Sequence, residues 1–170
     1  MENDSLANDV KTPTVQSLID TAGALLNRID SVQLAVLLRL RTIAPAIVDV
    51  FSCILALKPT GQENYQDGWR GAQVMIRDRN FLNHLRNYPN IMQERCSPRL
   101  IRRVNQILNL ESDQANTRRY LVGEKGVRNV IRIHRESGFL LEWVQTIVQL
   151  HNLMPCSTES VQMDSEEKNN

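Results

Sequence analysis

The sequence of 170 residues contains no long apolar run, which argues against a membrane-spanning helix. Such a helix needs about 20 consecutive apolar residues. The most hydrophobic region, residues 32–57, is interrupted by charged residues and a proline: Arg39, Arg41, Pro45 and Asp49. The first residues, MENDSLANDVKTPT, carry acids where a signal peptide has a basic stretch and a hydrophobic core. We therefore expect a chain that stays on the cytosolic side and has no membrane partner.

Cysteine and aromatic residues are scarce. Cys53, Cys96 and Cys156 are far apart and form no C-x-x-C pair, which argues against a disulfide framework and against a zinc site. Cys53 lies in an apolar segment, where a free thiol packs as a small hydrophobic group. Aromatic residues make up only 5% of the chain, so helices are favoured over a sheet built from aromatic and β-branched residues. The expected fold class is all-α.

Motifs for catalysis and nucleotide binding are also missing. The sequence contains no G-x-x-x-x-G-K-S/T, no G-x-G-x-x-G after a strand, no G-x-S-x-G and no H-E-x-x-H. His84 and His151 are expected at the surface or its boundary, and His134 as a satisfied histidine on an apolar helix face. A pairing of Cys96 with His84 has no evident third group to orient it. The sequence predicts no catalytic residue, no metal and no cofactor, and hence no enzyme.

The charge of the chain is unevenly distributed. The formal net charge is +1, but residues 1–30 and 156–170 each carry −3, which leaves +7 for residues 31–155. Of the seventeen basic residues in that middle part, fifteen are arginines. Guanidinium groups are planar forks that suit carboxylate and phosphate groups. A polyanionic partner is therefore expected.

Apolar residues near the amino terminus follow a heptad pattern. They recur at alternating spacings of three and four: Val15, Leu18, Ala22, Leu25, Ile29, Val32 and Val36. This seam fits a short coiled-coil segment over residues 14–30, and equally an amphipathic helix that lies on its own core. Thr12 to Thr14 form a helix start after a disordered leader, residues 1–13. Asp30 with Gln33 resembles a capping box, which predicts that the helix begins again there.

The rest of the chain reads as further helices joined by polar loops. A central core helix is expected over residues 45–57, then a loop over 61–68, and two short helices of which the second ends at Pro89. Ser97 and Pro98 open the next helix, with Arg99, Arg102 and Arg103 on its polar face. A single final helix is expected from Gly126 to Met154, before a disordered acidic tail, residues 156–170. The expected architecture is a small multi-helix globule, residues 31–155, flanked by short antiparallel coiled-coil segments.

Three separated patterns together resemble one family. The first comprises Leu26, Ile29, Leu34, Leu37 and Leu40 and continues through Pro45 into IVDVFSCILALKP. The second comprises Trp69, Met75 and Ile76, followed by Asn80, Phe81, Leu82, Leu85 and Tyr88. The third lies in the final helix and comprises Gly138, Leu141, Trp143 and Val144. In this order and at these intervals they resemble the microtubule-binding tip of a dynein heavy chain stalk.

The resemblance implies a six-helix globule that docks on tubulin and belongs to the cytoplasm or cytoskeleton, including a cilium or flagellum. It also implies which arginines contact the acidic tubulin surface: Arg39, Arg41, Arg77, Arg79, Arg128, Arg132 and Arg135. Two other functions remain open from the residues. The heptad helix fits a structural module that pairs with a partner helix or a dynein complex. Nucleic-acid binding by the arginine-rich helices is less favoured, because aromatic residues are not interleaved with the arginines.

Overall fold

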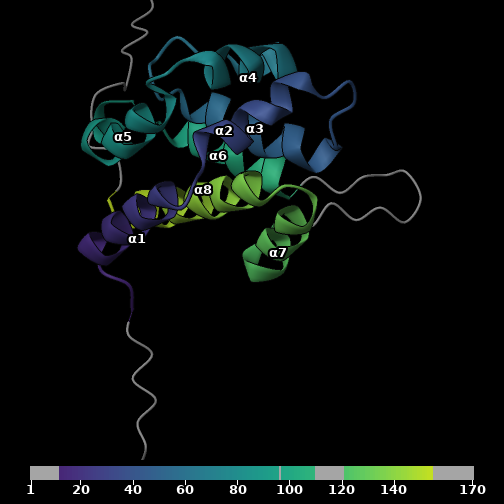
Figure 1. Ribbon diagram of the computed structural model, residues 1–170. Helices are drawn as coiled ribbons and strands as arrows, with labels where there is room; N and C mark the ends of the chain where they lie inside the picture. Colours follow the sequence, from purple (N-terminus) through teal and green to yellow (C-terminus); the bar gives the residue numbers. More distant parts are fainter. Residues whose placement is uncertain (1–11, 96, 110–120, 155–170) are drawn as a thin grey trace, which may run out of the picture.

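The computed structural model describes residues 12–95, 97–109 and 121–154. Over these residues the chain is all-α, as predicted: eight α-helices and two short 3-10 helices, with no strand (Figure 1). Most of the leader, the acidic tail, Cys96 and Cys156 lie outside the described residues. The helices are α1 (Val15–Asn27), α2 (Ser31–Val36), η1 (Leu37–Arg39), α3 (Pro45–Leu57), η2 (Tyr65–Asp67), α4 (Gly68–Arg77), α5 (Phe81–Arg95), α6 (Pro98–Leu108), α7 (Gly123–Ile133) and α8 (Arg135–Leu153).

Helix α3 is the central helix of the core, as the sequence predicts. It begins with Pro45 at its first position, where the missing N–H is not needed, and it packs against α4, α6 and α8. Phe51 is fully buried and meets the Trp69 ring edge-on, with ring centroids 5.6 Å apart. Cys53 is also fully buried; burial, with a smaller contribution from Asp49, raises the pKa of its thiol far above the usual range. Cys53 therefore acts as a core side chain.

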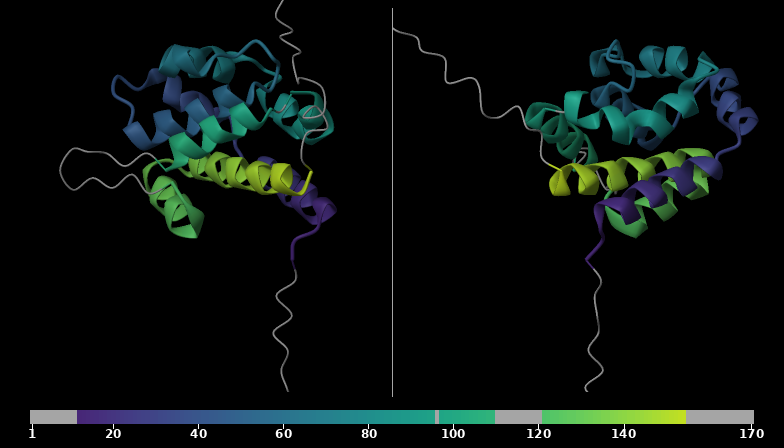
Figure 2. Two further views of the ribbon diagram at one scale, coloured as in Figure 1. Left: turned by 180° about the vertical axis from the view of Figure 1, so that it is seen from behind. Right: turned by 90° about the vertical axis from the view of Figure 1, so that its left-hand side faces the viewer.

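Helix α1 packs along α8 in the opposite direction (Figures 1 and 2). The Thr14 side chain caps α1 by accepting a hydrogen bond from the Ser17 backbone N–H at 3.1 Å. At its other end Arg28 lies over the ring of Phe139, in the second turn of α8. The first five seam residues turn toward this core, and four of them are buried in it: Leu18, Ala22, Leu25 and Ile29. Of the two alternatives for the heptad pattern, the structure thus favours an amphipathic helix that packs on the core of its own chain over a coiled-coil segment.

The seam does not continue into α2. Asp30 caps α2 by accepting a hydrogen bond from the Val32 N–H at 2.8 Å, so the helix begins again, as the capping box predicts. The new helix points in another direction, and Val32 is 70% exposed. The heptad pattern was wrong for Val32 and Val36, since a change of axis breaks the period.

Helix α5 extends six residues beyond its expected end at Pro89 and reaches Arg95. Proline removes one backbone hydrogen bond, which normally disfavours the helix interior. On the other hand Tyr88 and Met92, on either side of it, are fully buried. The Tyr88 hydroxyl also donates to the Leu57 carbonyl at 2.9 Å. Burial of the residues around Pro89 therefore holds the helix together.

The expected single final helix is two helices, α7 and α8, that fold against each other. The chain turns at His134, whose backbone is extended, with φ −155° and ψ 117°. At the other end of α7, the Gln145 side-chain amide donates to the Leu121 carbonyl at 2.9 Å. His151, expected at the surface or its boundary, is buried because α1 and α3 cover α8 on two sides.

Candidate functional site

The short helix α2 joins two distant parts of the chain. On one side, the carbonyl of Gln33 accepts a hydrogen bond from His134 Nε2 at 3.2 Å, at the junction of α7 and α8. On the other side, Ser31 lines a hollow of about 320 Å³ together with Arg77 and Arg79, at the junction of α4 and α5. Since Ser31 and Gln33 are only two residues apart, the two junctions lie close together around α2.

His134 has a structural role at this place. Its Nδ1 accepts a hydrogen bond from the Ser137 backbone N–H at 3.2 Å and so caps α8. In the neutral ring the proton is then on Nε2, which donates to Gln33. Glu136, which is buried, places Oε2 3.8 Å from the same nitrogen. The prediction that His134 is satisfied is confirmed, but it lies at a helix break and not on a continuous helix face.

Arginines from α1, α4, α7 and α8 gather around the two junctions beside α2. Arg28 and Arg135 both lie over the Phe139 ring, with their guanidinium carbons 4.4 and 5.3 Å from its centroid. Arg132 is exposed in the last turn of α7, two residues before His134. Arg77 and Arg79 lie on the other side of α2. We call these five arginines the basic pole: Arg28, Arg77, Arg79, Arg132 and Arg135.

The basic pole contains four of the seven arginines predicted from the sequence. The other three are exposed at neighbouring positions in the chain: Arg39 and Arg41 follow α2, and Arg128 precedes Arg132 by one turn of α7. Arg28 was not predicted, because a lone basic residue at the end of a helix gives no signal in the sequence. Only its contact with Phe139 brings it to the pole.

Exposed apolar side chains accompany the arginines. Val32 and Val36 are one turn apart on α2 and are 70% and 39% exposed, and Leu40 just beyond them is 46% exposed. Ile133, next to His134, is 53% exposed. Protein interfaces commonly combine an apolar centre with arginine and a polar rim. This part of the surface therefore combines exposed apolar side chains with exposed arginines.

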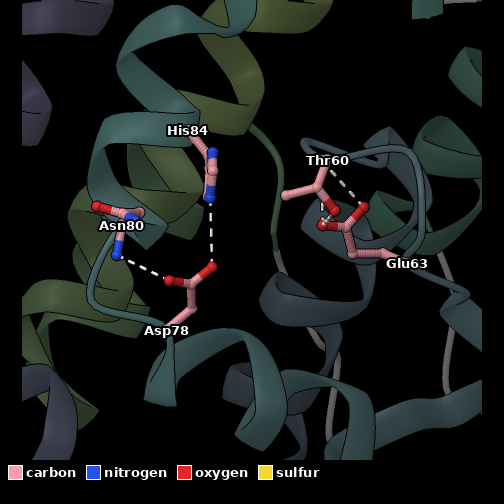
Figure 3. A network of polar contacts seen from close by, with 5 residues as sticks. All are labelled: Thr60, Glu63, Asp78, Asn80 and His84. Carbon is pink, nitrogen blue, oxygen red and sulfur yellow. Dashed lines mark hydrogen bonds and ion pairs between the residues drawn. The ribbon is translucent and has the colours of Figure 1, made fainter.

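A separate cavity of about 380 Å³ lies between the loop after α3 and helices α4 and α5. Figure 3 shows two groups of polar residues at this cavity, Thr60 with Glu63 and Asp78 with Asn80 and His84, all of which line it except Asn80. Glu63 accepts hydrogen bonds from the backbone and hydroxyl of Thr60, and Asp78 accepts from His84 Nε2 at 3.2 Å and from the Asn80 N–H at 2.9 Å. Asp78 is a partner for His84 that the sequence did not indicate. These hydrogen bonds stabilise the loop after α3 and the turn between α4 and α5.

Among the described residues there is no group of three or more side chains suited to hold a metal ion, and no helix long and apolar enough to cross a membrane. A scan against protein-family models and a search of the curated proteins each found no match to this chain. The resemblance to dynein stalk tips therefore stands as a proposal, to be weighed against the geometry of the basic pole.

Proposed function

We propose that this protein is a non-catalytic microtubule-binding module of the cytoskeleton, similar to the tip of a dynein heavy chain stalk. The observation that carries the proposal is the position of the basic pole. Helices α1 and α8 lie side by side in opposite directions, and the pole stands where α1 ends and α8 begins (Figures 1 and 2). The start of α1 and the end of α8 lie together at the opposite end, as in a two-stranded stalk.

The chemistry of the pole suits an acidic protein surface. All five arginines of the pole are exposed, so their guanidinium groups are available for charge-assisted hydrogen bonds to carboxylates. The surface of tubulin is strongly acidic, and the exposed valines of α2 add apolar area between the arginines. Contacts between exposed charges weaken with salt, since the Debye length shortens from about 30 Å at 0.01 M to about 8 Å at 0.15 M ionic strength.

The alternative function, assembly through the heptad helix, requires a free seam. Leu18, Ala22 and Leu25 are instead buried against the core of their own chain. The exposed part of the pattern is limited to Val32 and Val36, which belong to the exposed apolar side chains that accompany the basic pole.

Co-sedimentation with taxol-stabilised microtubules tests the proposal. We expect the protein to pellet at low salt and to be released as salt rises. The variant Arg77→Glu with Arg132→Glu reverses one charge on each side of α2, and its affinity is expected to fall at least about tenfold, roughly 1.4 kcal/mol, because two charge-assisted contacts become repulsive.

The matched control is Arg99→Glu with Arg102→Glu. Both residues are exposed on α6, outside the pole, and the net charge changes by the same amount. This control is expected to keep its affinity within about twofold. Absence of pelleting at low salt, or an equal loss in both double variants, would show that the pole does not bind microtubules.

A further inference from the structure

A second basic surface lies on α6, outside the basic pole. A groove of about 700 Å³ runs between α6, η2 and the end of α3. Its cationic side chains are Lys58, Arg99, Arg102 and Arg103, and none of the described residues that line it is acidic. The three arginines follow one face of α6 with Gln106 one turn further on, over a length of about 10 Å. The groove thus concentrates four positive charges around one hollow.

Tyr65 contributes a hydroxyl group to this groove from a distant part of the chain. Arg103 lies over the Tyr65 ring, its guanidinium carbon 4.1 Å from the centroid, and donates a hydrogen bond to the phenol oxygen at 2.6 Å. This hydrogen bond is the largest cause that lowers the pKa of the Tyr65 phenol, and the charge of Arg99 adds to it. A hydrogen bond with the Gln66 side chain is the second cause, so Tyr65 ties two other side chains of the groove together.

Lys58 is held in the groove by an uncommon backbone conformation. It ends α3 with φ 52° and ψ 67°, the left-handed region that favours glycine. A glycine at this position would be the common choice for a helix end. A lysine occupies the position instead, and it is one of the residues that line the groove.

We propose that the α6 groove binds a compact, phosphate-rich small molecule, either free or as the headgroup of a phosphorylated lipid. Arginine forks match phosphate oxygens in pairs, and lysine supplies a point charge between them. Asn64 and Gln106 line the same hollow and offer further amide donors.

The shape of the groove favours this ligand over two polymers. Single-stranded nucleic acid needs aromatic faces on which bases stack. Tyr65 is the one aromatic residue among the described residues that line the groove, and Arg103 covers a face of its ring. An extended peptide commonly adds to a sheet edge, and a helical one lies in a long apolar groove. The α6 groove is instead a hollow between a helix, a 3-10 turn and a helix end.

Isothermal titration calorimetry of the whole chain with inorganic tripolyphosphate tests the inference, with sulfate at equal ionic strength as reference. We expect tripolyphosphate to bind tighter than sulfate by at least about tenfold. Lys58→Gly and Arg102→Gln are each expected to weaken tripolyphosphate binding about fivefold or more, because each removes one cation. Lys58→Gly suits the left-handed backbone, so its melting temperature should not fall, and a loss of binding then has no explanation in unfolding.

The control Arg77→Gln with Arg132→Gln removes two charges from the basic pole and should leave tripolyphosphate binding within about twofold. Vesicles that contain phosphorylated inositol lipid or only phosphatidylserine distinguish a lipid source from a free one. Equal binding of sulfate and tripolyphosphate, equal losses in groove and pole variants, or tighter binding of oligothymidylate than of tripolyphosphate would each overturn the inference. Unchanged microtubule pelleting of the groove variants separates this result from the proposed function.

Discussion

Gly138→Ala is expected to destabilise the protein by about 3 kcal/mol, since no space exists for the added methyl group. A Cβ at this position would collide with the side chain of Ile131 and would lie 3.0 Å from both its Cα and its backbone N. The side chain could move, but the backbone atoms belong to the last turn of α7, which is tied to α8 at both ends. Gln145 holds Leu121 at the start of α7, and His134 and Ser137 fix the corner at its end. The methyl group therefore forces α7 and α8 apart.

The same substitution at Gly23 is the matched control and should have the opposite sign. Apart from the neighbouring backbone of α1 itself, a Cβ there meets no heavy atom of the described residues within 4 Å, and the residue lies in the interior of α1. Alanine is favoured over glycine in a helix interior, so Gly23→Ala should stabilise the protein by about 0.5–1 kcal/mol. Urea unfolding of the two variants measures the difference. A Gly138→Ala variant as stable as the parent would show that α7 is free to shift along α8.

Much of the fold follows from local signals in the sequence. Thr14, Asp30 and Ser97 each precede a helix and accept a hydrogen bond from its first turn, as expected for caps. Pro45 marks the start of α3, and the apolar period of residues 45–57 marks a helix that is buried on most sides. These features depend on neighbours within one turn, and for that reason a single sequence reveals them.

The errors occur where distant contacts outweigh local preference. Pro89 disfavours a helix interior, but the burial of Tyr88 and Met92 keeps α5 continuous. At His134 a local contact, the cap on the Ser137 N–H, is joined by a distant one. The imidazole Nε2 donates to the carbonyl of Gln33, about a hundred positions away in the sequence. Spacing along one segment carries no information about such a partner.

In the candidate sites, too, the sequence indicates some residues, whereas others are brought in only by contacts between distant segments. The charge tally indicated a basic middle segment, and the resemblance to dynein stalk tips selected four of the arginines that surround α2. Arg28 joins them only through the Phe139 ring, and Tyr65 joins the α6 arginines from 38 positions away. The absence of aromatics among the arginines argued against nucleic-acid binding, and it gave no sign that Tyr65 would join the arginines of α6.

Leu25→Ala is expected to destabilise the protein by about 2–5 kcal/mol, whereas Val32→Ala should change its stability by less than about 0.5 kcal/mol. The two residues are one heptad apart and occupy equivalent positions in the seam. Leu25 is 4% exposed against the core of its own chain, while Val32 on α2 is 70% exposed. Removal of a buried side chain leaves a cavity, and removal of an exposed one leaves only solvent.

Urea unfolding at two protein concentrations about tenfold apart distinguishes this arrangement from a coiled coil between chains. A seam shared by two chains would make both substitutions costly and would shift the midpoint of unfolding with concentration. The intramolecular packing of α1 on α8 predicts one costly substitution and a constant midpoint. A heptad pattern states which face of a helix is apolar, but not whose surface covers it. In this chain α1 is covered by its own α8, and the continuation of the pattern, Val32 and Val36, is exposed beside the basic pole.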